Sequence, residues 1–240
     1  MILAAGRGTR LRPITETTPK ALVEVDGVPM LDRVARRLVA ARADRLIVNV
    51  HHLAGAVERH LATVDYGAEV RVSHEPQGLL GTGGGVANAE PHFRGEAPFF
   101  VHNVDVISDL DLEALYAAHR EDDAIATLAV QRRDTDRTLL FDEAGLLGWE
   151  NAATGASERV REAAGPVRRW PFAGVHVIEP AFFGRVDRSG AFSIVRAYLD
   201  LVEAGRRIAP WDAGDARWLE VGNRERLARA REILSGRARG

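Results

Sequence analysis

Short β-rich runs alternate with helical patterns through the first half of the chain, and this alternation restricts the fold more than any other feature. Strands are predicted at residues 1–5, 46–50, 68–73, 98–101 and 125–130. Helices are predicted at residues 29–42, 53–63 and 110–120, with a short helix after the glycines at 83–85. Strands joined through helices form parallel βαβ units whose sheet is covered on both faces. We therefore expect an α/β fold with a mixed, mostly parallel sheet.

The pattern changes after about residue 132. Two β-rich runs, 138–141 and 146–150, flank Asp142-Glu143-Ala144-Gly145, which is typical of a hairpin. Residues 157–169 are polar, rich in arginine and without periodicity, so a mobile loop is expected there. The remaining predicted elements are strands at 172–178 and 218–221, a helix at 194–203 and a last helix capped by Asn223.

No linker or internal repeat divides the chain. We expect one domain over residues 1–234, with a β-rich insertion over about 132–180 at the sheet edge. A frayed tail is expected at 235–240.

Composition narrows the classes of function. Hydrophobic residues make up 46% of the chain, which is typical of a globular protein. The net charge is −2, so electrostatics give no reason to expect binding to nucleic acid or anionic lipid. Cysteine is absent, which excludes disulfides, thiolate zinc sites and cysteine nucleophiles. No apolar run approaches the roughly 18 residues that a membrane helix needs. We expect a cytoplasmic protein without membrane or nucleic-acid partners. The chain starts directly on its first predicted strand, which is compatible with further residues upstream of Met1.

The loop after the first strand has the composition of a phosphate site. Small residues let backbone N–H groups approach an anion, and several cations surround them. The small residues are Ala4, Ala5, Gly6 and Gly8, and the cations are Arg7, Arg10, Arg12 and Lys20. Lys20 is the only lysine in a chain rich in arginine, which indicates a position that needs an ammonium group. The alternative is a loop whose arginines are merely solvated.

Two familiar phosphate motifs do not fit this loop. Leu11 stands where the dinucleotide fingerprint needs glycine, and Pro13 interrupts the helix that should follow. The sequence also lacks the Gly-x₄-Gly-Lys-Ser/Thr pattern of a P-loop.

An acid ends the apolar run at 99–104. Asp105 follows this run at the expected carboxyl edge of the sheet, where it could hold Mg²⁺ against phosphate oxygens. The alternative role, a helix cap, suits Asp109 or Asp111 better. Mg²⁺ is expected rather than Zn²⁺, because cysteine is absent and His51-His52 are adjacent residues that point in opposite directions on a strand.

The glycine-rich run Gly81-Thr82-Gly83-Gly84-Gly85 follows a predicted strand and opens a helix. Each glycine in a helix costs about 1 kcal/mol relative to alanine, which indicates a need for close approach. We expect a nucleobase to lie against Gly81 and Gly83, with Thr82 bonding its edge. The alternative is a flexible turn.

Several of these motifs together resemble a known family. Leu3-Ala-Ala-Gly-Arg-Gly-Thr-Arg-Leu-Arg-Pro13 with Pro19-Lys20-Ala-Leu22 resembles the signature of the sugar-1-phosphate nucleotidyltransferases. The resemblance implies a Rossmann-like fold and a reaction in which an NTP and a sugar 1-phosphate give an NDP-sugar and pyrophosphate. It also implies nucleotide binding by Leu3, Ala4, Ala5, Gly6, Gly8 and Thr9, with Arg10 steadying pyrophosphate and Lys20 contacting the reacting phosphates.

The same resemblance extends to later segments. Trp218-Leu-Glu-Val-Gly222 is similar to the family's Trp-x-Asp-x-Gly motif, with Glu220 as a second Mg²⁺ ligand. In the segment Asn103-Val104-Asp105, Val104 replaces the glycine that usually precedes the acid in the family. Glu150, Asn151 and Gly174 match positions that bind sugar hydroxyls, although Asn151 replaces a usual lysine. Thr82-Gly-Gly-Gly85 resembles the segment in N-acetylmuramate 1-phosphate uridylyltransferases, which slightly favours UTP over GTP. Guanylyltransferases acting on mannose or heptose 1-phosphate are the competing interpretation.

Other functions stay open from the sequence. A cytidylyltransferase for a phosphocholine-type substrate would use the same fold. A non-catalytic nucleotide-sugar sensor would explain why Glu220 and Val104 depart from the family's usual residues. The expected partners are an NTP and a sugar 1-phosphate, and a homo-oligomer is compatible with the sequence.

Overall fold

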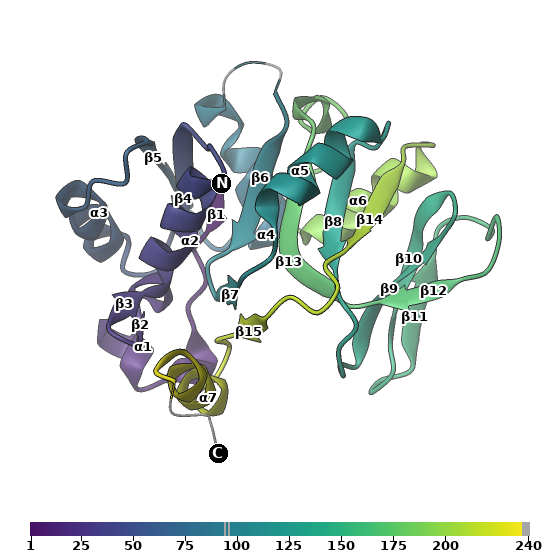
Figure 1. The fold of residues 1–240 in the computed structure, drawn as a ribbon. Helices are drawn as coiled ribbons and strands as arrows, with labels where there is room; N and C mark the ends of the chain where they lie inside the picture. Colours follow the sequence, from purple (N-terminus) through teal and green to yellow (C-terminus); the bar gives the residue numbers. More distant parts are fainter. Residues whose placement is uncertain (94, 96, 237–240) are drawn as a thin grey trace.

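The computed structural model describes residues 1–93, 95 and 97–236. Its centre is a seven-stranded sheet in the order β14-β8-β13-β6-β1-β4-β5 (Figure 1). These strands are β1 (Ile2–Leu3), β4 (Arg45–Val50), β5 (Glu69–His74), β6 (Phe99–Asn103), β8 (Ala126–Val130), β13 (Phe172–Ile178) and β14 (Ile208–Asp212). Neighbouring strands run parallel except β13, which is antiparallel to both β6 and β8. The predicted mixed, mostly parallel sheet is confirmed.

Helices cover both faces of this sheet (Figure 1). One apolar cluster includes residues of α2 (Met30–Ala40), α3 (Ala54–Thr63), α5 (Leu112–Glu121) and α7 (Arg224–Leu234). The other includes residues of α4 (Gly81–Asn88) and α6 (Ile194–Glu203). The helical spacing seen in α2 has the expected cause, because Leu31, Val34 and Leu38 are all buried in the first cluster.

Side-chain caps start two of the helices as predicted. Asp111 Oδ1 accepts from Ala114 N at 2.9 Å at the start of α5. Asn223 Oδ1 accepts from Arg226 N at 2.8 Å at the start of α7. Since Asp111 caps α5, Asp105 has no capping role. Helix α7 ends in a turn through Ser235 and Gly236, and the rest of the expected frayed tail, 237–240, lies outside the described residues.

Short elements fill the connections. They are η1 (Thr9–Leu11), α1 (Ile14–Thr17), η2 (Lys20–Leu22), β2 (Glu24–Val25), β3 (Val28–Pro29), η3 (Glu90–His92), β7 (Val106–Ser108), η4 (Pro180–Phe182) and β15 (Trp218–Glu220). Within the described residues, no helix combines the length and the hydropathy needed to cross a bilayer.

A second sheet of four strands stands beside the central one (Figure 1). Its strands are β9 (Arg137–Asp142), β10 (Gly145–Asn151), β11 (Ala156–Arg159) and β12 (Arg168–Trp170), in the order β11-β10-β9-β12. The expected hairpin is β9–β10. The prediction of a loop over 157–169 was wrong at both ends of this segment, where the chain forms β11 and β12. These short strands are rich in exposed polar residues, so hydrophobic periodicity does not reveal them. The small sheet also ends at Trp170, before the expected 180, because β13 joins the central sheet.

Another central strand, β14, was missed in the sequence. Pro210 lies inside it, and a proline lowers the expectation of a strand. The position of β14 at the edge of the central sheet explains why the proline is tolerated.

Two buried histidines make stability depend on pH. His102 on β6 and His176 on β13 are each 1% exposed. Burial lowers the pKa of His102 to about 4 and that of His176 to about 3, whereas an unfolded histidine has a pKa near 6.5. The unfolded chain therefore binds more protons below pH 6.5, and stability falls as the pH falls from 6.5 toward these lower values. We expect a loss on the order of 2 kcal/mol for each histidine between pH 7 and 5.

Urea unfolding at pH 7 and at pH 5 measures this effect. The variant His102→Gln should show a smaller loss between the two pH values than the wild type. His74→Gln is the control, because His74 is exposed. An equal loss in all three proteins would contradict the assignment.

Candidate active site

Two acids that lie far apart in the sequence meet at the carboxyl edge of the central sheet. Asp105 lies between β6 and β7, and Glu220 ends β15. Strands β7 and β15 pair antiparallel, with Glu220 opposite Val106. Val221 N also donates to the carbonyl of Asp105 at 2.8 Å. The structure thus brings the two predicted metal ligands together. Val104, which replaces the family's glycine, is buried in the core and leaves this arrangement intact.

The loop after β1 brings Lys20 to Asp105. Lys20 Nζ forms an ion pair with Asp105 Oδ2, and the two side chains are only 12% and 17% exposed. Gly8 allows the loop to fold over the lysine, because its φ is +61° and a Cβ there would lie 3.1 Å from Lys20 Cβ. Thr15 Oγ1 donates to the carbonyl of Gly8 at 2.8 Å and closes the turn. The side chain of Lys20 is therefore held at the first acid.

The glycines of this loop differ in what surrounds them. A Cβ at Gly8 would lie 2.9 Å from Thr15 Cγ2, whereas one at Gly6 would meet nothing within 4 Å. We expect Gly8→Ala to lower the free energy of unfolding by about 1–3 kcal/mol, because it combines a left-handed backbone with a steric clash. Gly6→Ala should change stability by less than about 0.5 kcal/mol. Urea unfolding of both variants tests this difference, and equal stabilities would contradict it.

Glu220 is surrounded by guanidinium groups. Arg10 Nη2 lies 3.6 Å from Glu220 Oε1, and Arg226 Nη1 contacts Glu220 Oε2. Gly222 leaves room for this approach, because a Cβ there would lie 2.6 Å from Glu220 Oε1. The Arg10 side chain is 64% exposed, so it can move to meet an anionic ligand.

A cavity of about 850 Å³ opens beside the two acids. Its lining includes the residues predicted to bind metal and sugar, namely Asp105, Glu220, Glu150, Asn151 and Gly174. The structure thus brings these five residues to one space. The predicted nucleotide residues of the β1 loop do not line this cavity, and neither do Gly81, Thr82 and Gly83.

The three residues predicted to bind the sugar have defined surroundings. Glu150 Oε1 accepts from Arg169 Nε at 2.5 Å. Asn151 Oδ1 accepts from Ala153 N at 3.1 Å and so stabilises the turn after β10. Gly174 has φ +75°, and a Cβ there would lie 2.7 Å from Asn103 Nδ2. A side chain at position 174 would therefore displace Asn103, which also lines the cavity.

Sequence reasoning missed a stacked pair in the cavity wall. The Arg133 guanidinium lies 3.6 Å from the ring centroid of Trp218, and Trp218 Nε1 donates to the carbonyl of Ala173 at 2.8 Å. Burial lowers the pKa of Arg133 to about 10, so the group stays charged at neutral pH. Trp218 was part of a motif, but no sequence pattern links it to Arg133.

The glycine-rich helix α4 packs against protein. A Cβ at Gly83 would lie 2.4 Å from the ring of Phe192, and one at Gly84 would lie 2.4 Å from the carbonyl of Gly190. Thr82 Oγ1 accepts from Ile194 N at 2.9 Å, next to the start of α6. The expected need for close approach at Gly83 is real, but in this structure its partner is α6 and the segment before it. The contact with a nucleobase stays a prediction.

The donors at the paired acids suit Mg²⁺. Mg²⁺ is usually bound by one or two carboxylates together with phosphate oxygens and water. Glu220 on β15 supplies one carboxylate, and Asp105, directly before the paired strand β7, supplies another. The described residues contain no cluster of three or more His, Cys, Asp or Glu that could hold a metal by protein ligands alone. His51 and His52 are engaged with the backbone carbonyls of Glu75 and Thr15.

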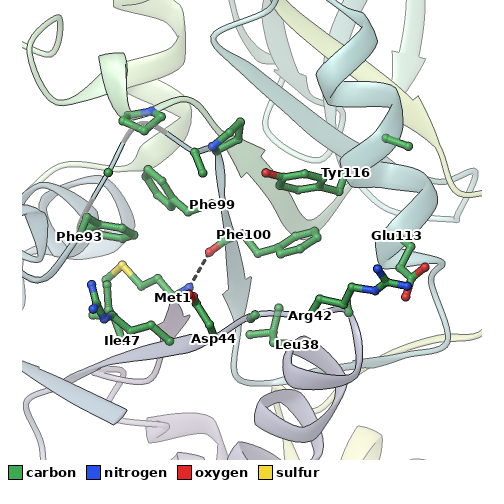
Figure 2. A pocket seen from close by; sticks show the side chains of 18 residues that line it. Met1, Leu38, Arg42, Asp44, Ile47, Phe93, Phe99, Phe100, Glu113 and Tyr116 are labelled. Atoms are coloured by element: carbon green, nitrogen blue, oxygen red, sulfur yellow. Dashed lines mark hydrogen bonds between the residues drawn. The ribbon is translucent and has the colours of Figure 1, made fainter. Parts of the chain in front are cut away.

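Another cavity, of about 620 Å³, lies next to Met1, Arg45 and Phe99, where strands β1, β4 and β6 begin. Figure 2 shows this cavity from close by. Its lining combines apolar side chains such as Leu38 and Phe99 with charged ones such as Arg42 (Figure 2). The Met1 amino group donates there to the carbonyl of Phe100 at 2.6 Å. None of the predicted site residues lines it. The candidate active site is therefore the cavity with the paired acids.

The fold and this site define the class of protein. The model of the family described as "Nucleotidyl transferase" matches residues 1–139, which is more than half of the chain. N-acetylmuramate alpha-1-phosphate uridylyltransferase of Caulobacter vibrioides is 34% identical over 233 residues, covering 93% of this chain and 91% of that protein. The catalytic subunit beta of mannose-1-phosphate guanylyltransferase of Drosophila melanogaster is 32% identical over 193 residues, covering 78% of this chain and 50% of that protein.

A solved structure shares the fold. The inositol-1-phosphate CTP transferase from T. maritima superposes with a TM-score of 0.79 at 21% identity, covering 100% of this chain and 95% of that one. The chain belongs to the sugar-1-phosphate nucleotidyltransferase family, and it is an enzyme of that type.

Proposed function

We propose that the enzyme transfers UMP from UTP to a sugar 1-phosphate with the help of Mg²⁺. The observation that carries this proposal is the placement of Lys20, Asp105 and Glu220 at the edge of a cavity large enough for a sugar. The relative from Caulobacter vibrioides supports UTP, and makes N-acetylmuramate 1-phosphate the first acceptor to test.

The reaction needs no dedicated general base. The phosphate group of a sugar 1-phosphate is mostly dianionic at neutral pH, since its second pKa is about 6. One of its oxygens attacks the α-phosphorus of UTP, and the bond between that phosphorus and the β-phosphate oxygen breaks. UDP-sugar and pyrophosphate are formed. The chain must therefore hold two polyanions in line and stabilise the charge on pyrophosphate.

Each residue has a role in that task. Lys20 exchanges its contact with Asp105 for the reacting phosphates, and Arg10 binds the departing pyrophosphate from its exposed position. Glu150 and Asn151 bind sugar hydroxyls in the cavity, where Gly174 leaves room for them. When bound, Mg²⁺ supplies positive charge that offsets the repulsion between the phosphates, and Asp105 and Glu220 would hold it.

Pyrophosphate release across four NTPs and a set of acceptors tests this function. The acceptors are N-acetylmuramate, mannose, heptose and glucose 1-phosphates, with phosphocholine to test the cytidylyltransferase alternative. We expect the highest rate with UTP and a sugar 1-phosphate, and no release without Mg²⁺. A highest rate with GTP would shift the proposal to a guanylyltransferase, and nucleotide binding without any release would indicate a sensor.

Arg10 gives a test of the leaving-group side of the site. We expect Arg10→Ala to lower kcat about 10–100-fold, because an exposed cation contributes less than a buried one. Arg229→Ala, an exposed arginine on α7, serves as the control. Wild-type turnover by the Arg10 variant would remove this residue from the mechanism.

A further inference from the structure

A buried polar pair lies between the β1 loop and α4. Asn49 is the second-to-last residue of strand β4, and Glu75 follows directly after β5. Each is only 2% exposed. A buried carboxylate and a buried amide are costly unless their polar atoms are bonded. Neither residue belongs to the cavity with the paired acids or has a role in the mechanism above.

The two side chains form a chain of three hydrogen bonds. Ala4 N donates to Asn49 Oδ1 at 2.7 Å. Asn49 Nδ2 donates to Glu75 Oε1 at 2.6 Å, and Leu80 N donates to Glu75 Oε2 at 2.9 Å. Ala4 belongs to the β1 loop, and Leu80 is the residue from which α4 starts. The pair therefore joins the two segments that are predicted to hold the nucleotide.

Helix α4 is packed directly onto this pair. A Cβ at Gly85 would lie 2.7 Å from Asn49 Nδ2 and 2.8 Å from Glu75 Oε1. The last glycine of the run, Gly85, is thus explained by the pair beneath it. The carbonyl of Leu80 also accepts from Phe192 N at 2.9 Å, so both backbone groups of this residue are fixed.

We propose that Asn49 and Glu75 are positioning residues for the nucleotide, which set the separation between the β1 loop and the start of α4. This inference rests on the proposed function, in which those two segments bind one NTP. The direction of each bond is determined at both ends, because backbone N–H groups can only donate. With the carboxyl groups ionised, exchanging the amide or the carboxylate at only one of the two positions therefore leaves at least one mismatched contact, whichever way the side chains turn.

Because the donors and acceptors of these three hydrogen bonds are fixed, the amide and the carboxylate can be exchanged between positions 49 and 75 as a test. Asn49→Asp places two carboxylates face to face. Glu75→Gln places the new side-chain NH₂ group against either Asn49 Nδ2 or the backbone N–H of Leu80, so that two donors face each other. In the double variant N49D/E75Q, the new amide at position 75 donates to the new carboxylate at position 49, and both backbone donors again find oxygen acceptors. We expect each single variant to raise KM for UTP at least tenfold, with a smaller change in KM for the sugar 1-phosphate. The double variant should return KM for UTP to within about threefold of wild type.

E75Q separates positioning from simple charge effects. Removing an acid near an anionic ligand would lower KM for UTP, whereas a broken link raises it. Asn88→Asp is the matched control, because Asn88 on α4 donates to Ser73 Oγ at 3.0 Å and His74 O at 2.9 Å without touching the β1 loop. We expect its KM for UTP to match wild type.

Two outcomes overturn the proposal. One is a folded single variant, checked by circular dichroism, with a wild-type KM for UTP. The other is a folded N49D/E75Q protein whose KM for UTP stays tenfold above wild type, whether or not the single variants fold. Calorimetry of UTP binding is measured alongside turnover. A wild type that binds UTP but releases no pyrophosphate would refute the proposed transfer, while the binding data would still test the pair.

Discussion

Lys20→Ala should lower kcat for pyrophosphate release by about 10²–10³-fold, which is the cost of removing one charged donor from a site that stabilises developing charge. Lys20 is well placed for such an effect, because its side chain is only 12% exposed and lies at Asp105. Water therefore screens it little, and its interaction with a phosphate is strong. The measurement is the steady-state rate at saturating UTP and sugar 1-phosphate.

Two further variants test how specific the requirement is. Lys20→Arg should recover little activity, because the Lys20 side chain is only 12% exposed with its ammonium at Asp105, and a planar guanidinium needs more space than an ammonium. Arg36→Ala, an exposed change on α2, should keep the wild-type rate. A Lys20→Ala protein with normal turnover would show that this lysine does not contact the reacting phosphates.

Asp105→Asn should have an effect of similar size, about 10²–10³-fold on kcat, and should also weaken the binding of Mg²⁺. The substitution keeps the shape of the side chain but removes the charge that faces Lys20 and the proposed metal. Calorimetric titration of Mg²⁺ in the presence of nucleotide provides a readout that does not depend on turnover. We expect a clear loss of affinity.

Asp109→Asn is the matched control for this experiment. Asp109 lies four positions further along, its Oδ1 accepts from Arg217 N at 2.6 Å, and it does not line the cavity. Its rate and Mg²⁺ affinity should stay close to wild type. If Asp105→Asn binds Mg²⁺ as tightly as Asp109→Asn, the metal is held elsewhere.

Local sequence patterns predicted most of the fold and, in the candidate site, the position of Asp105. The apolar run before Asp105 predicted its place at the sheet edge, because a buried strand and the acid after it are both visible in consecutive residues. The helical spacing of Leu31, Val34 and Leu38 likewise predicted α2. Such signals are carried by neighbouring residues and do not depend on the rest of the chain.

Local sequence patterns did not predict the contacts between segments that lie far apart in the chain. The stacking of Arg133 on Trp218 depends on how two segments meet, and no periodicity encodes it. The glycines of α4 were correctly expected to need close approach, but the partner of Gly83 is Phe192, more than a hundred positions later. The strands at the two ends of 157–169 were missed because their residues are polar, so pairing with β9 and β10 decides their conformation.

The pairing of β15 with β7 has a consequence for how the enzyme comes into being. Glu220 comes next to the segment of Asp105 only after β15 has paired with β7. The following helix, α7, packs back on the start of the fold, where Arg231 donates to the carbonyl of Glu24, 207 positions earlier, at 2.9 Å. A nascent polypeptide on the ribosome can already carry its lysine and first acid, yet it lacks the second acid until residue 220 has been synthesised. A translation product that stops before residue 220 therefore has no complete acid pair, and under the proposed function we expect it to be inactive.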